Sequence, residues 1–104
     1  MVAARFDRFQ SVFACDLVEA ELRSACRREG IPFGDAMLRQ LELILPKRSL
    51  RPEFATVLAA GLVRGADCFH LAVALSLVEN PRDLTFLTLD KRQREVAAAL
   101  GFET

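Results

Sequence analysis

Residues 66–78 constrain the fold most, because apolar side chains cover nearly the whole circumference of the helix that this segment predicts. A helix that is apolar on all sides has no face suited to water, so it must lie inside a folded domain. The chain has 104 residues, of which 52% are hydrophobic, and such a chain can enclose this helix in one small core. We therefore predict a single domain over residues 1–104, with residues 66–78 at its centre.

The rest of the chain alternates between helical patterns and short apolar segments. Helical spacing runs from Leu17 to Arg28, with Asp16 as a suitable N-cap and Gly30 as a C-terminal stop. Further helices are predicted at residues 35–41, at 52–62 and from Asp90 to Gly101. Short strands are predicted at residues 11–14, 41–45 and 84–89, although residues 41–45 could also continue the preceding helix. This alternation predicts a three-layer α/β domain with a mostly parallel sheet.

Composition restricts the cellular setting and the partners. The 14 basic residues balance the 14 acidic ones, so any contact with nucleic acid must come from local clusters of Arg and Lys. Cys15, Cys26 and Cys68 share no metal-type spacing and lie in apolar or helical runs, which favours buried free thiols and a cytoplasmic location. The longest apolar run, Leu71 to Val78, is far shorter than the roughly 20 residues of a membrane span. We expect no membrane partner.

Glu21 is the first of three carboxylates that stand out as candidate ligands. Glu19 has Arg23 four residues later, an ordinary exposed ion pair, whereas Glu21 has Ala25 at that spacing and small or apolar neighbours on its face. A carboxylate in such surroundings needs a positive or hydrogen-bonding partner, and a divalent cation is one. The alternative is a half-exposed acid paired with a distant Arg.

Asp67 and Asp90 are the other two. Asp67 lies in the first turn of the apolar helix, and Asp90 follows the predicted strand 84–89, at the end where open α/β sheets place ligands. Each also has a structural interpretation: Asp67 as an acid favoured by the helix dipole, and Asp90 as an N-cap with Gln93 closing a capping box. Carboxylate oxygens on separate elements are the ligands that Mg²⁺ or Mn²⁺ takes.

Other polar residues give weaker signals. His70, the one histidine of the chain, is better explained as a packed core residue than as a catalytic base. Basic residues that flank the candidate acids would serve either as phosphate contacts or as a solvated face; they are Arg64, Lys91, Arg92 and Arg94. No phosphate-binding glycine loop, zinc spacing or nucleophile elbow is present.

Two segments, Val63–Leu75 and Leu84–Asp90, strongly resemble the C-terminal half of PIN-domain proteins of the VapC toxin type. Upstream, Cys15–Leu22 is similar to the family's helix that follows a short strand and carries a catalytic glutamate before a leucine. The resemblance extends from about Val12 to Phe102 and implies a PIN-like α/β/α domain with a short, mostly parallel sheet.

The resemblance also implies a site and a function. Glu21, Asp67 and Asp90 fall on catalytic, metal-binding positions of the family, and Thr88 falls on a polar position beside them. The expected function is a Mg²⁺- or Mn²⁺-dependent endoribonuclease that cleaves RNA with a metal-activated water. The expected partners are the RNA substrate, a cognate VapB-like antitoxin that blocks the site and a second copy in a homodimer.

One part of the family pattern is missing. The family opens with an apolar strand that ends in an aspartate, and no such segment precedes Phe13; Asp7 has no strand before it and does not take that role. Loss of this central strand would remove a ligand and leave neighbouring strand edges unpaired. The alternative function is therefore an inactive PIN remnant that acts through antitoxin binding or self-association, and a third is an unrelated α/β binding domain in which Asp67 and Asp90 only stabilise helix ends.

Overall fold

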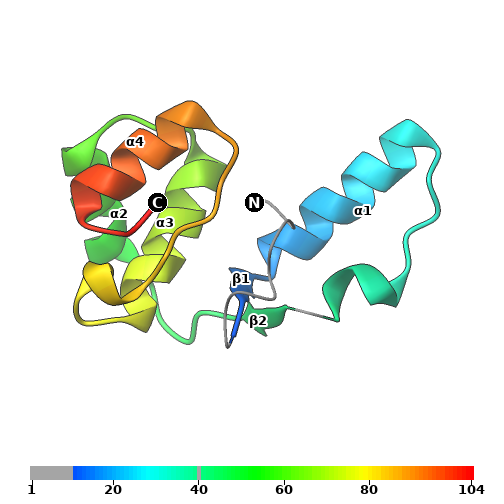
Figure 1. The fold of residues 1–104 in the computed structure, drawn as a ribbon, viewed down its shortest axis with the longest axis horizontal. Helices are drawn as coiled ribbons and strands as arrows, with labels where there is room; N and C mark the ends of the chain where they lie inside the picture. Colours follow the sequence, from blue (N-terminus) through cyan, green and yellow to red (C-terminus); the bar gives the residue numbers. More distant parts are fainter. Residues whose placement is uncertain (1–10, 40) are drawn as a thin grey trace. The chain divides into compact units, whose positions relative to one another are not determined.

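The computed structural model describes residues 11–39 and 41–104 (Figure 1). Contacts divide the chain into two compact units, one ending at Leu45 and the other covering Pro46–Thr104. The prediction that no strand ending in an aspartate precedes Phe13, with Asp7 unsuited to that role, lies outside the described residues.

The first unit contains two short strands that pair in parallel. Its elements are β1 (Phe13–Cys15), α1 (Leu17–Glu29), the 3₁₀ turn η2 (Asp35–Leu38) and β2 (Glu42–Ile44). Ala14 lies opposite Leu43, and the Glu42 N–H donates to the Val12 carbonyl over 2.8 Å. Because this pairing begins at Glu42, the helix predicted over residues 35–41 is only one short turn, and the strand predicted at 41–45 is confirmed.

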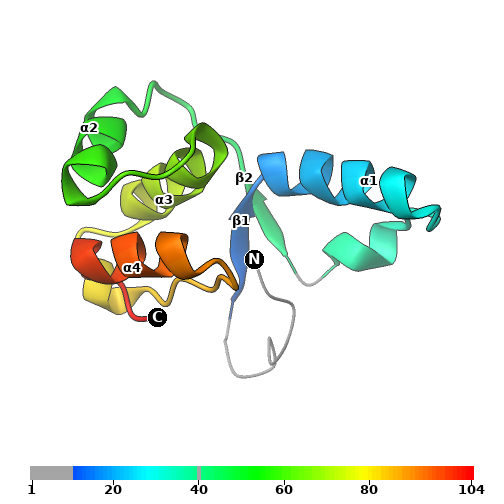
Figure 2. The same ribbon diagram turned by 90° about the horizontal axis from the view of Figure 1, so that it is seen from above.

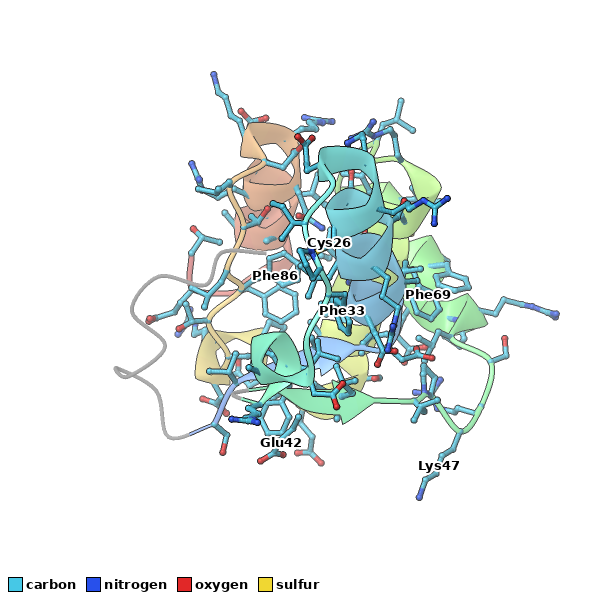
Figure 3. The ribbon with its side chains drawn as sticks, turned by 90° about the vertical axis from the view of Figure 1, so that its right-hand side faces the viewer. Cys26, Phe33, Glu42, Lys47, Phe69 and Phe86 are labelled. Atoms are coloured by element: carbon cyan, nitrogen blue, oxygen red, sulfur yellow. The ribbon has the colours of Figure 1, made fainter. Side chains whose placement is uncertain are left out.

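Helix α1 begins and ends where the sequence predicts, but its start is stabilised differently. Asp16 occupies the N-cap with helical angles, φ −64° and ψ −16°, and its side chain makes no capping hydrogen bond, so its predicted capping role is wrong. Gly30 ends the helix with φ 70°, a left-handed conformation suited to glycine. The Arg23 guanidinium lies 4.2 Å from the centre of the Phe33 ring, which holds the segment after α1 against the helix (Figure 3).

The second unit is a helical cluster built around a buried helix (Figure 2). Its elements are α2 (Arg51–Ala60), α3 (Gly65–Leu77), the 3₁₀ turn η3 (Pro81–Asp83) and α4 (Lys91–Leu100). Helix α2 packs against both α3 and α4. Leu71 of α3, Val57 of α2 and Val96 of α4 are almost completely buried, which confirms that the apolar segment 66–78 belongs to the core.

The apolar helices were compared with the length and composition that a membrane-spanning helix needs. Within residues 11–39 and 41–104, no single helix has both the length and the apolar composition to cross a membrane. Helices α2 and α3 meet both conditions only when taken together, across a bend of 112°. In the structure, α3 instead buries Leu71, Ala72 and Val73.

Residues 84–89 do not form the predicted strand. Thr85 makes an isolated parallel bridge with Glu103, the Phe86 N–H donates to the Glu103 carbonyl over 2.8 Å, and the Glu103 N–H donates to the Leu84 carbonyl over 3.1 Å. A strand needs a neighbouring backbone along its length, and within the part of the chain described here the segment after α4 supplies it at one point. Phe86 packs on Phe102, with ring centres 5.9 Å apart (Figure 3).

The described residues therefore have an α/β fold with a parallel two-stranded sheet. Cys15, Cys26 and Cys68 are buried and form no disulfide bond, as predicted. Burial raises the pKa of Cys15 and of Cys68, which keeps both thiols protonated at neutral pH.

Candidate functional site

Two of the predicted ligands lie where two helices of the second unit begin. Asp67 is in the first turn of α3, and Asp90 is the N-cap of α4. Thr88 precedes α4, and Gln93 lies in its first turn. Hydrogen bonds connect all four residues, which we call the Gln93 cluster: Asp67, Thr88, Asp90 and Gln93.

Asp90 has the predicted N-cap role. Its Oδ1 accepts a hydrogen bond of 2.8 Å from the Gln93 backbone N–H. In a full capping box the Gln93 side chain would accept in return from the Asp90 N–H, but that N–H donates instead to Oγ1 of Thr88 over 3.0 Å. The capping box is therefore only half formed. A carboxylate has about four lone-pair sites, so the cap leaves the exposed Asp90 acceptor capacity for a cation.

The side chain of Gln93, released from the capping box, joins the two helix starts. Gln93 is 5% exposed and Thr88 is 7% exposed. The Thr88 hydroxyl donates to Oε1 of Gln93 over 2.7 Å, and Nε2 of Gln93 donates to the Asp67 backbone carbonyl over 3.4 Å. Burial without these bonds would cost about 1–3 kcal/mol for each polar group, and within the described residues no buried side-chain polar atom lacks a partner.

Asp67 has a weak cationic partner. Its Oδ2 lies 3.7 Å from Nε of Arg64, and the two side chains are 24% and 87% exposed. A solvent-exposed pair of this kind contributes about 0–1 kcal/mol. The start of α3 also favours negative charge at Asp67 through the free N–H groups of its first turn. A cation that bound this carboxylate would displace only a solvent-screened guanidinium.

The basic residues near the cluster differ in what they do. Arg94 donates to the Thr88 carbonyl over 3.0 Å, and Arg92 donates to the Leu62 carbonyl over 3.0 Å, so both hold the α4 region together. Arg64, in contrast, projects into solvent beside Asp67. Of the four basic residues, Arg64 is the one whose side chain lies beside the Asp67 carboxylate.

Glu21 belongs to the other unit and differs from its prediction. It lies on α1 and is exposed, which a carboxylate in need of a buried cation partner would not be. Its charge contributes to the raised pKa of Cys15, after burial and the charge of Asp16. Glu19 and Arg23 form the predicted exposed ion pair, with 2.8 Å between Oε2 and Nε. The structure thus joins Asp67, Thr88 and Asp90 through Gln93, while Glu21 stands in a separate unit.

The residues fit a divalent cation in part. Across residues 11–39 and 41–104, no three His, Cys, Asp or Glu side chains are grouped as a metal site. Mg²⁺, however, usually keeps several waters and is bound by one or two carboxylates together with substrate phosphates. Asp67 and Asp90 supply that number of oxygen ligands. Half-buried His70 lies one helical turn after Asp67.

Sequence reasoning missed the role of Gln93. Its position three residues after Asp90 is the usual signal of a capping box, and that signal hid the alternative. The available clue was Thr88, a hydroxyl residue two places before the N-cap that competes for the same N–H.

The sequence matches no protein-family model, and no curated protein or solved structure matches it significantly.

Proposed function

We propose that the chain is a ribonuclease of the PIN, VapC-toxin type that hydrolyses RNA phosphodiester bonds with Mg²⁺ or Mn²⁺. The observation that carries this proposal is the connection between Asp67 and Asp90. Asp67 and Asp90 lie 23 residues apart in the sequence, and both are hydrogen-bonded to Gln93 at the starts of two helices, Asp67 through its backbone carbonyl and Asp90 through its carboxylate. Acids brought together in this way, beside an exposed Arg, suit a metal and phosphate site.

In this proposal each residue has a defined task. Asp67 and Asp90 hold the cation. The bound ion supplies a water of lowered pKa that can attack a phosphodiester. Arg64, which is 87% exposed, binds a phosphate oxygen of the RNA. Thr88 orders the backbone at Asp90 through its 3.0 Å hydrogen bond with that N–H.

The proposed partners are a cognate VapB-like antitoxin and a second copy of the chain, in the cytoplasm. Large apolar side chains in the second unit support contacts of this kind. Leu58, Leu62 and Leu89 are 49%, 77% and 76% exposed. Leu89 lies directly beside Asp90, so a protein that covered it would also restrict access to that carboxylate.

The alternative, an inactive PIN remnant, is favoured by one observation: no group of three potential ligands is found in the described ranges. The remnant would keep the apolar surfaces for antitoxin binding or self-association, but it would not cleave RNA.

Cleavage of single-stranded RNA by the purified chain, with and without EDTA, tests the proposal. Asp67→Asn is the test variant. Asp83→Asn is the matched control, since Asp83 is an exposed acid of the same unit in the separate turn η3. We expect metal-dependent cleavage by the wild type and the control, and none by Asp67→Asn. Cleavage of equal rate in all three chains would refute the site, and no cleavage by the wild type would favour the remnant.

A further inference from the structure

We propose that Gln93 is a positioning residue that fixes Asp67 and Asp90 relative to each other, with Thr88 setting the orientation of its amide. This inference rests on the proposed function of the two carboxylates. It goes beyond that function because Gln93 itself touches neither cation nor RNA in the proposal.

Three hydrogen bonds carry the inference. The Gln93 N–H donates to Oδ1 of Asp90 over 2.8 Å, its Oε1 accepts from Thr88 over 2.7 Å, and its Nε2 donates to the Asp67 carbonyl over 3.4 Å. The last bond spans 26 residues and joins α4 to α3. One residue thus contacts both candidate ligands, through the side chain of one and the backbone of the other.

The direction of each bond follows from the chemistry of the groups. The Asp90 N–H can only donate, so Oγ1 of Thr88 must accept there, and its single proton remains for Gln93. A donated proton requires the amide oxygen of Gln93, and its NH₂ group must then face Asp67. The Asp67 carbonyl can only accept, so this orientation satisfies all three residues and flipping the amide would break two bonds.

An apolar side chain would be the simpler occupant of this position. Gln93 is 5% exposed on the inner side of α4, a place where Leu or Met would bury more apolar surface without needing partners. The amide adds a fixed connection between the two helix starts. Residues that orient metal ligands in this way typically change metal affinity or activity about 10–100-fold when mutated.

The test compares Mn²⁺ affinity, RNA cleavage and urea unfolding for Gln93→Met, which keeps the length of the side chain and removes its polar bonds. We expect a folded protein with Mn²⁺ affinity and kcat both lowered about tenfold. A purely structural Gln93 would lower the unfolding midpoint and leave Mn²⁺ affinity unchanged at temperatures where the chain is folded, and that result would overturn the inference.

Thr88 provides a second pair of variants if Gln93→Met fails to fold. Thr88→Ser keeps the hydroxyl and should retain wild-type affinity and cleavage, whereas Thr88→Val removes it and should behave like Gln93→Met. Equal activity of the Ser and Val variants would contradict the positioning role. Wild type and Asp67→Asn are measured in parallel: if the wild type neither binds Mn²⁺ nor cleaves RNA, the proposed function fails and this inference with it. If Asp67→Asn loses both properties while Gln93→Met keeps both, only the positioning role fails.

Discussion

The side-chain amide of Gln93 donates a hydrogen bond to the backbone carbonyl of Asp67, 26 residues earlier in the chain. This bond joins the first turn of α4 to the first turn of α3. Gln93 also donates its backbone N–H to the Asp90 carboxylate, so the same residue bonds the backbone of one candidate ligand and the side chain of the other. Variants of Asp67, Asp90 and Gln93 should therefore show whether each residue contributes to the free energy of unfolding, to metal binding or to both.

Asp90→Asn should separate the N-cap from the proposed ligand. Asn is about as good an N-cap as Asp, so the free energy of unfolding should change little, whereas Asp90→Ala should lose about 1 kcal/mol. Both variants remove a carboxylate ligand and should abolish metal-dependent cleavage. Urea unfolding and RNA cleavage are the two measurements. An Asp90→Asn chain that cleaves RNA at the wild-type rate would show that Asp90 only caps the helix.

Arg64→Ala should weaken RNA binding without affecting the fold, because the side chain is 87% exposed. Removal of a phosphate contact should raise KM for RNA, while Mn²⁺ affinity should stay constant or rise because a competing positive charge beside Asp67 is lost. Arg82→Ala is a suitable control, since Arg82 is an exposed basic residue in η3. A KM that is equal in the two variants and the wild type would exclude Arg64 from the RNA contact.

Gly61→Ala should destabilise the second unit. A Cβ at this position would come within 2.8 Å of Cγ2 of Val96, which is a core residue and 1% exposed. Overpacking of this kind typically costs about 1–3 kcal/mol. Gly65→Ala is the matched control, because a Cβ there meets no atom within 4 Å, and a helical Gly→Ala change is stabilising by about 0.5–1 kcal/mol. The free energy of unfolding of both variants is measured in urea. Equal values for Gly61→Ala and Gly65→Ala would contradict the packing of α2 on α4.

Stability should fall at alkaline pH because Cys15 is buried as a neutral thiol. Burial is the largest cause of its raised pKa. A group with a raised folded-state pKa contributes stability that is fully present below the unfolded-state pKa, here 9.0, and is lost as pH rises through the folded-state value. The drop in unfolding free energy between neutral pH and pH above 9.0 should be smaller in Cys15→Ala. An identical drop in both chains would show that the thiol does not ionise on unfolding.

The sequence predicted those features that depend on residues close together in the chain. The apolar circumference of residues 66–78 predicted a buried α3, and Asp16 and Gly30 marked the ends of α1. Residues 84–89 were mispredicted because a strand exists only when a second backbone pairs with it, and sequence pattern does not report pairing. The bonds of the Gln93 side chain were missed for a similar reason, since its partner Asp67 lies on another helix. Glu21, expected among small and apolar side chains, is exposed.

Calorimetric titration of the purified chain with Mn²⁺, wild type against Asp67→Asn, tests the central claim most directly. The account predicts binding of one ion by the wild type, and a loss of about tenfold or more in affinity when this carboxylate becomes an amide. Asp83→Asn should bind as the wild type does. No binding by a folded wild-type chain, or equal binding by wild type and Asp67→Asn, would contradict a metal site at Asp67 and Asp90.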